Sequence, residues 1–252
     1  MTKTIGLLVM AYGTPRKTEE IEQYYTHIRG GRKPTEDQLE ELKARYERIG
    51  GLSPLTDITD RQVQGLEAKL NQFRQDLSFK TYLGLKHIDP FIEDAVQAMH
   101  QEGIQEAVSI VLAPHYSTLS VKTYHQRALE EAERLGWPMI HSIDAWYEEP
   151  AFIDYWVKEL KQTFHRVPKE EQEKTAVIFS AHSLPERILQ FNDPYPEQVQ
   201  HTAEMIAEKT GVKHFAVGWQ SAGKSPEPWL GPDVKDLTKA LYDSADYRAF
   251  IY

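Results

Sequence analysis

Two residues that follow short apolar runs, His182 and Tyr12, are the side chains of this sequence best placed for chemistry. The run AVIF leads into SAHSLP, which contains His182, and the run LLVM leads into AYGTP, which contains Tyr12. Such runs are typical of buried parallel strands, and open α/β sheets bind ligands beyond the carboxyl ends of their strands. An imidazole can serve as a metal ligand or as a base near neutral pH. A hydrogen-bonded loop histidine is the simpler interpretation of one such residue, but the repeated pattern favours one ligand approached from both sides.

The elements that would position these residues form two similar halves. Apolar runs predict strands at Ile5–Met10, Phe79–Leu85, Ala107–Ala113, Met139–Ile143, Val177–Ser180, Phe215–Val217 and Ala249–Tyr252. Helical patterns predict helices at 17–29, 35–48, 56–74, 120–135 and 150–165, one with Pro90 at its first position, and one from about Pro232. The alternation predicts an α/β fold of two lobes with parallel sheets flanked by helices, at residues 1–145 and 146–252, with a ligand cleft between them.

The two halves differ in extent. The strands that contain Leu7, Tyr82 and Ser109 correspond in order to those that contain Val177, Phe215 and Phe250. The first half continues into a further loop, helix and strand, whereas the second half stops after its third strand. We therefore expect the second lobe to be incomplete.

The composition limits the class of protein. The chain has 252 residues, 40% of them hydrophobic and 27% charged, with a formal net charge of -9 and no cysteine. An acidic surface argues against broad nucleic-acid binding, and no apolar run approaches the ~20 residues that a membrane span requires. The N-terminal run is interpreted as a first strand rather than a signal peptide. The absence of cysteine excludes disulfides and thiolate chemistry and fits a cytoplasmic location.

A second function is suggested by the segment GWQSAGKS, which matches the P-loop pattern and contains Lys224. A P-loop requires a helix that begins at its Lys-Ser pair, so that the helix amides can hold phosphates. Here Pro226, Pro228 and Pro232 follow, and proline removes a donor and biases the preceding residue away from helix. We expect a loop, and a nucleotide hydrolase stays the less favoured alternative.

Further candidates follow other strands or lie in the first helices. His87 and His115 come just after strands, where a core or capping role is the simpler interpretation for each, but Lys86 would let the first loop meet an acidic ligand. A basic group is formed by Arg29, Arg32, Lys33 and Arg45. Such a group is usually a solvated surface, yet arginine binds carboxylates in bidentate fashion, so a ligand with several carboxylates is plausible. Aromatic side chains near the same loops could wall a flat apolar ligand: Tyr24, Tyr25, Tyr46, Tyr116, Tyr124, Trp219 and Trp229.

Several stretches together resemble the ferrochelatases along essentially the whole chain. They are GLLVMAYGTP, YYTHIR, RYERIGGLSPL, GLKHIDPFIEDAV, SIVLAPHYS, SAHSLP, VGWQS and PWLGPDVKDL. The sequence is most similar to the type from Gram-positive bacteria that inserts iron into coproporphyrin. The resemblance implies two Rossmann-like lobes around a porphyrin cleft, ferrous iron as a substrate and no permanently bound cofactor. It further implies a cytoplasmic monomer that binds coproporphyrin III, without nucleic acid or stable membrane insertion, and that can contact other enzymes of heme synthesis.

The resemblance also implies roles for individual residues. His182 matches the metal-site histidine of the family, and Tyr12 matches the tyrosine that binds product iron axially, so both are expected as catalytic and metal-binding groups. The expected substrate-binding residues are Arg29, Arg45, Tyr46, Ser53, Tyr124, Lys86, His87 and Trp229. The polar loop at 29–34 suits a substrate with four propionates rather than porphyrin taken from a membrane. Gly30 stands where close relatives often carry a second arginine, and Lys224 falls at a position that the family varies.

One departure from the family pattern concerns the segment that follows AFIY. In the family this strand continues as PVGFVxDHLEVLYD, which supplies a metal-site glutamate and further acidic residues, and a closing helix packs on the first lobe. These 252 residues contain neither segment. A regulatory magnesium site near Arg45 is therefore doubtful here, because its carboxylates lie in that segment. Two hypotheses remain beside the hydrolase: an active ferrochelatase, and a porphyrin- or heme-binding relic without turnover.

Overall fold

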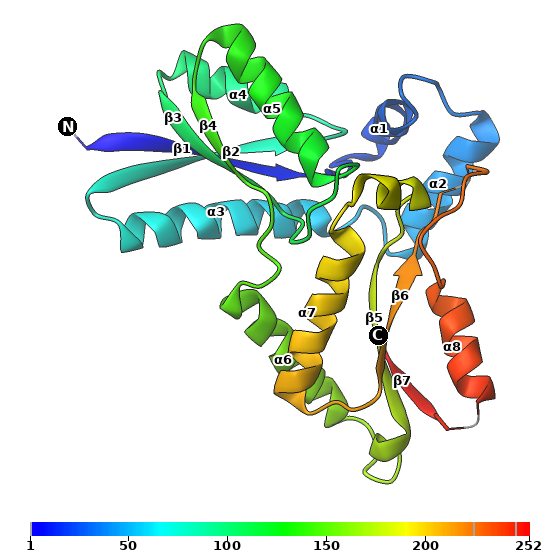
Figure 1. Cartoon of the computed structure of the whole chain (residues 1–252). Coiled ribbons are helices and arrows are strands. Elements are labelled where there is room, and N and C mark those ends of the chain that lie inside the picture. Colours follow the sequence, from blue (N-terminus) through cyan, green and yellow to red (C-terminus); the bar gives the residue numbers. More distant parts are fainter. Residues whose placement is uncertain (1, 224, 245) are drawn as a thin grey trace. The chain divides into compact units, whose positions relative to one another are not determined.

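The computed structural model describes residues 2–223, 225–244 and 246–252 of the chain (Figure 1). Contacts between Cα atoms divide the chain into two compact units. Unit 1 comprises residues 1–113 and 122–144, and unit 2 comprises residues 114–121 and 145–252. Each unit is an α/β structure built around one parallel sheet, as the alternating apolar runs predict.

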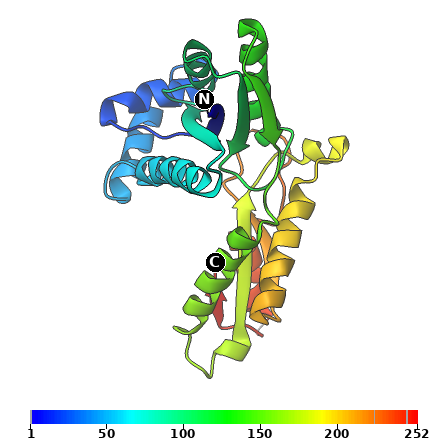
Figure 2. The same cartoon turned by 90° about the vertical axis from the view of Figure 1, so that its left-hand side faces the viewer.

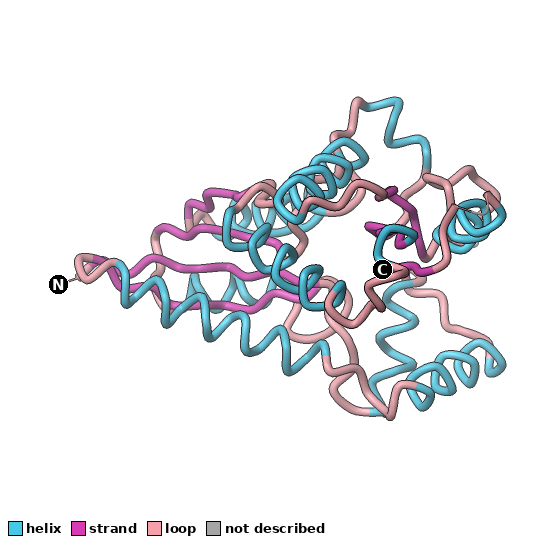
Figure 3. The backbone as a smooth tube through the Cα atoms, turned by 90° about the horizontal axis from the view of Figure 1, so that it is seen from below, coloured by secondary structure: helices cyan, strands magenta, loops and turns pink. Residues whose placement is uncertain are grey.

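The sheet of unit 1 has four parallel strands in the order β2-β1-β3-β4, which Figure 3 shows side by side. Their bounds are β1 Lys3–Ala11, β2 Leu77–Leu85, β3 Glu106–Val111 and β4 Met139–Ile143. The central strand β1 is buried from Ile5 to Ala11, because it has neighbours on both edges and helices on both faces. A continuous apolar run is what such a position requires.

Helices cover both faces of this sheet. In Figure 1, α3 (Leu55–Phe73) lies along one face, and α4 (Ile92–Gln101) and α5 (Val121–Leu135) lie on the other. The helices α1 (Ile21–Ile28) and α2 (Glu36–Arg48) follow β1, with a short 3-10 turn at Thr18–Glu20. Helix α2 begins with a capping box, in which the Thr35 side chain accepts a hydrogen bond from the Gln38 amide.

Unit 2 contains a three-stranded parallel sheet in the order β6-β5-β7. The strands are β5 Thr175–His182, β6 Phe215–Gln220 and β7 Ala249–Ile251. Figure 2 shows α6 (Pro150–Phe164) and α7 (Tyr195–Thr210) together on one face, and Figure 1 shows α8 (Val234–Asp243) on the other. Two 3-10 turns, Gln172–Lys174 and Glu186–Phe191, flank β5. The apolar faces of α6 and α7 meet β5 and β7 in a core that includes Ile153, Leu160, Val177, Ile206 and Ile251.

The predicted correspondence between the two halves is confirmed by the sheet topology. In unit 1, β1 lies between β2 and β3, and in unit 2, β5 lies between β6 and β7. The strands therefore occupy equivalent positions in the same sequence order. Tyr12 follows the central strand of one sheet and His182 ends the central strand of the other.

Three local predictions need correction. Pro90 is not the first residue of a helix: α4 begins at Ile92, because the main-chain amide of Phe91 bonds to the Asp94 carboxylate at 2.8 Å and Pro90 O accepts from the Leu85 amide. His182 is the last residue of β5, paired with Gln220, rather than the first residue beyond the strand. The last helix begins at Val234, after Asp233, whose side chain accepts from the Lys235 amide.

Candidate functional site

The carboxyl ends of β1 and β2 bring Tyr12, Lys86 and His87 together in unit 1. The main-chain amide of Lys86 donates a 2.9 Å hydrogen bond to Ala11 O, which continues the parallel pairing to the point where both strands end. The Tyr12 and His87 rings lie 4.5 Å apart between centroids. Tyr12 is 45% exposed, and partial burial, followed by the nearby Tyr46, raises the pKa of its phenol.

His87 is held by a second histidine that the sequence analysis did not single out. Nδ1 of His87 lies 3.0 Å from Nδ1 of His27, a residue of the last turn of α1. The His27 ring stacks on Phe91, with centroids 5.1 Å apart. Partial burial, followed by the neighbouring Lys86 and His27 side chains, lowers the pKa of His87 to about 4, so the His87 ring is neutral at pH 7.

Lys86 is fixed over an aromatic ring. Its ammonium lies 4.7 Å from the ring centroid of Tyr124 and donates to Thr123 Oγ1 at 2.9 Å. Its carbonyl accepts a 2.8 Å hydrogen bond from Arg127, whose guanidinium is also paired with Glu93. Burial and the Arg127 charge lower the pKa of Lys86. The ends of β1 and β2 thus present the half-buried ammonium of Lys86 beside the neutral rings of Tyr12 and His87.

The remaining predicted residues of unit 1 lie in the segments that follow β1. Tyr46 Oη is 3.1 Å from Thr14 Oγ1, which ties the last turn of α2 to the loop after Tyr12. The Arg29 guanidinium lies 5.5 Å from the Tyr25 ring and donates through Nε to Arg32 O. Arg45 is paired with Glu41 on the exposed side of α2. Ser53 Oγ accepts a 3.2 Å hydrogen bond from the Leu55 amide at the start of α3.

In unit 2, His182 is anchored through its main chain. The Tyr195 hydroxyl donates to His182 O at 3.0 Å, and the adjacent Ser183 donates through its amide to Gln220 O and through its hydroxyl to Leu230 O. His182 is an exposed residue at the end of β5. Partial burial lowers the pKa of His182, so the ring is neutral at pH 7 and has a free lone pair to offer.

The described residues of the segment that matches the P-loop pattern do not have the structure of a phosphate-binding loop. Strand β6 runs to Gln220, and among the described residues after it no helix begins before Val234; Lys224 itself lies outside the described residues. A Cβ atom added at Gly223 would lie 2.3 Å from the Trp229 ring. Trp229 also donates through Nε1 to Ser225 Oγ at 3.1 Å. The glycine of the pattern thus admits an indole ring over the backbone, and the helix that a phosphate site needs is not at this point.

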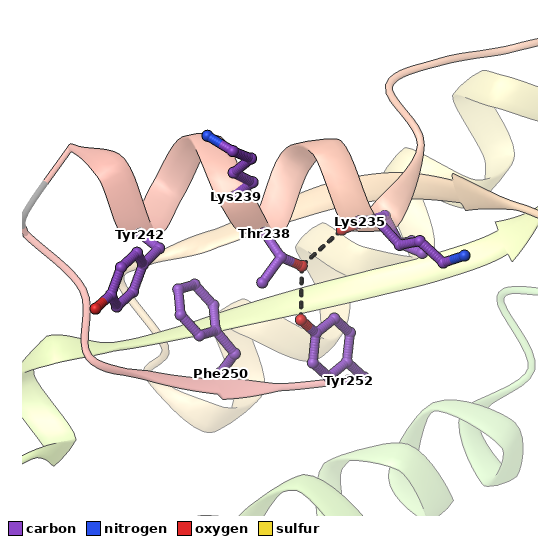
Figure 4. A pocket seen from close by; sticks show the side chains of 7 residues that line it. Lys235, Thr238, Lys239, Tyr242, Phe250 and Tyr252 are labelled. Atoms are coloured by element: carbon purple, nitrogen blue, oxygen red, sulfur yellow. Dashed lines mark hydrogen bonds between the residues drawn. The ribbon is translucent and has the colours of Figure 1, made fainter.

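Two surface grooves lie beside helices α8 and α1. A groove of about 460 Å³ lies between α8 and β7 and is lined by Lys235, Lys239, Tyr242 and Phe250 among others (Figure 4). It contains none of the predicted site residues. A groove of about 600 Å³ lies beside α1 and includes His27. Within the described ranges, no three His, Cys, Asp or Glu side chains form a group that could hold a metal ion.

These features define the class of protein as a two-unit parallel α/β protein with chemistry-bearing side chains at the ends of its central strands. The ferrochelatase family model matches residues 4–252, and the chain belongs to the ferrochelatase family. Its relatives include the coproporphyrin III ferrochelatases of Geobacillus sp. (strain WCH70), 60% identical over 99% of this chain and 81% of the relative, and of Bacillus subtilis (strain 168), 58% identical over the same shares. That of Listeria monocytogenes serovar 1/2a is 58% identical over 100% of this chain and 82% of the relative.

Among the described residues, no helix is both long enough and apolar enough to cross a membrane.

Proposed function

We propose that this protein inserts ferrous iron into coproporphyrin III to form coproheme. The observation that carries the proposal is the identity of 58–60%, over nearly the whole chain, to proteins named coproporphyrin III ferrochelatases. The chemistry of the strand ends supports it. The reaction requires a neutral base, a metal ligand and cations that bind a polyanionic ring, and the described residues offer each of these.

His182 is the proposed base and iron ligand. Metalation removes two pyrrole protons and strips water from the ferrous ion. A neutral imidazole can accept a proton and suits iron as a ligand, and the lowered pKa of His182 keeps it neutral at pH 7. Its carbonyl contact with Tyr195 fixes the backbone from which the ring projects.

Tyr12 is the proposed axial ligand of the product iron. Its raised pKa keeps the phenol protonated in the free protein. A metal ion favours the deprotonated form of its ligand, so iron at this position would draw the proton from the hydroxyl. Tyr12 would then distinguish product from substrate, because metal-free porphyrin has no centre for a phenolate to bind.

The propionates of the substrate are the proposed partners of the cations in unit 1. Arg29 and Arg45 are partly or fully exposed, and Lys86 is held over Tyr124. Guanidinium groups bind carboxylates with two parallel hydrogen bonds, whereas an ammonium contributes a point charge. His87, Tyr46, Ser53 and Trp229 are proposed to complete the substrate contacts.

The test is anaerobic insertion of ferrous iron into coproporphyrin III, followed by loss of free-porphyrin absorbance. We expect turnover by the wild type and a loss of about 10²-fold or more in His182→Ala, with porphyrin binding retained. His201→Ala, which removes an exposed histidine of the same unit paired with Glu148, is the matched control and should keep turnover. Turnover by His182→Ala at the wild-type rate would refute its role. Wild-type protein that binds coproporphyrin without inserting iron would replace the proposal with a porphyrin-binding function.

A further inference from the structure

Two imidazoles meet directly at the proposed substrate site of unit 1. Nδ1 of His27 and Nδ1 of His87 are 3.0 Å apart, although the residues are separated by 60 positions in the sequence. The ring centroids are 5.1 Å apart, with the planes at 74°. This separation is close to the sum of the nitrogen–nitrogen distance and the two ring radii, so the nitrogens face one another. The arrangement is that of a hydrogen bond in which one Nδ1 donates and the other accepts.

The facing nitrogens argue against a metal chelate at this position. In a chelate, both lone pairs must point to a third position occupied by the ion, whereas here each nitrogen points at the other. No further His, Cys, Asp or Glu among the described residues completes a group of three with this pair. Sharing a proton therefore accounts for the geometry better than holding an ion.

We propose that His27 is a positioning residue, which holds the His87 ring through Nδ1 so that only Nε2 of His87 remains for the porphyrin ligand. This inference rests on the proposed function, because it names the anionic tetrapyrrole as the ligand. His27 is itself held, since its ring stacks on Phe91 with centroids 5.1 Å apart and planes at 30°. The chain of contacts continues from His87 to Tyr12, 4.5 Å away between ring centroids.

The physical consequence is pre-organisation. A free imidazole rotates about two side-chain bonds and exchanges between two tautomers, and both freedoms must be lost when it binds a ligand. A partner on Nδ1 fixes the tautomer and the ring direction before the ligand arrives, as partners of metal-bound histidines do. Removal of His27 should therefore weaken binding without changing the bond-making step.

The experiment compares three single variants. His27→Phe keeps a ring on Phe91 but removes the nitrogen, and His27→Asn returns a hydrogen-bonding group near the position of Nδ1. His100→Phe is the matched control, because His100 also stacks on an aromatic residue, Trp137, at 4.1 Å. We expect His27→Phe to raise KM for coproporphyrin III about 2- to 10-fold with kcat within about twofold of wild type. His27→Asn should recover most of this loss, and His100→Phe should behave as wild type.

A double variant separates positioning from a general structural role. If His27 acts through His87, His27→Phe should add little to the KM of His87→Phe, because the ring that it positions is already gone. Equal effects of His27→Phe in both backgrounds, or an unchanged KM in the single variant, would overturn the inference.

A ligand-free measurement distinguishes failure of this inference from failure of the proposed function. Nitrogen-15 NMR should show one tautomer for His87 in the wild type and a mixture in His27→Phe. If the His87 tautomer changes in this way between wild type and His27→Phe, but the wild type neither binds nor metalates coproporphyrin, the proposed function is refuted and the His27–His87 pairing stands. If the wild type is active and His87 keeps the same single tautomer in His27→Phe, only the positioning role of His27 is refuted.

Discussion

The hydroxyl of Tyr195 donates a 3.0 Å hydrogen bond to the main-chain oxygen of His182. Tyr195 opens α7, and its ring is buried against Trp219, with centroids 5.6 Å apart. Burial, together with the nearby Asp193, raises the pKa of Tyr195 to about 12, so the phenol remains a donor throughout the working pH range. The last residue of β5 is thus tied to the first turn of α7 by one bond.

We predict that Tyr195→Phe destabilises the protein by about 1 kcal/mol, because it removes this bond and leaves the His182 carbonyl without its donor. The measurement is the free energy of unfolding in urea. Tyr155→Phe, at an exposed tyrosine of α6, is the control and should change stability by less than about 0.5 kcal/mol. Equal stability of Tyr195→Phe and wild type would show that the bond contributes nothing to folding.

Asp193 connects two distant segments of unit 2. Its buried carboxylate accepts from the Ser117 hydroxyl, from the amide and hydroxyl of Thr118 at 2.6 Å each, and from the Tyr195 amide at 3.0 Å. Asp193→Ala would leave these donors unsatisfied. We expect a loss of about 3 kcal/mol in the free energy of unfolding.

The control for Asp193 is another aspartate of unit 2. Asp154 pairs with Lys209 at 2.7 Å, but both side chains are about half or more exposed. Such surface pairs contribute about 0–1 kcal/mol, so Asp154→Ala should have a small effect. Urea unfolding of both variants checks the contrast, and a similar loss in the two would contradict the special role of the buried carboxylate.

His115 should make stability depend on pH. Burial lowers its pKa to about 4, whereas the unfolded chain has the ordinary value of about 6.5. Between pH 6.5 and 4 the unfolded state binds a proton that the folded state does not, so the free energy of unfolding falls as the pH is lowered. Its Nε2 donates to Thr202 Oγ1 at 2.9 Å, since that hydroxyl itself donates to Gln198 O.

His115→Gln tests this dependence, because an amide can still donate to Thr202 but does not titrate. We expect the stability of His115→Gln to fall less than that of wild type between pH 7 and pH 4.5, measured by urea unfolding at a series of pH values. His201→Gln is the control at an exposed histidine of the same unit. Parallel pH profiles for wild type and His115→Gln would rule out His115 as the source.

Replacing either of two glycines that have open surroundings by alanine should change the stability of the protein, but in opposite directions. A Cβ atom at Gly65, inside α3, or at Gly211, after α7, would meet nothing within 4 Å. Gly65 has helical backbone, so Gly65→Ala should stabilise the protein by about 0.5–1 kcal/mol. Gly211 has φ of +75°, so Gly211→Ala should destabilise by about 1 kcal/mol. Thermal unfolding of the two variants measures the difference, and shifts of the same sign would contradict it.

Much of the local structure followed from the sequence. The apolar runs predicted the seven strands of the described residues, and the continuous run at Ile5–Met10 matches the burial of β1, which needs apolar residues on both faces. The order of strands in the two halves predicted their equivalent places in two sheets. The sequence also predicted that Tyr12 and His87 each come just after a strand, and the structure shows that these two strands, β1 and β2, are neighbours in one sheet.

Only the tertiary structure determined the contacts between side chains that lie far apart in the sequence. His27 and His87 are 60 residues apart, and α1 and β2 must both be in place before their nitrogens meet. Trp229 covers Gly223 only after the loop beyond β6 folds back on itself, which explains a glycine that the sequence associated with phosphate binding. Sequence periodicity records which face of an element is buried, whereas the partner of a polar side chain depends on where the rest of the chain brings its own polar groups.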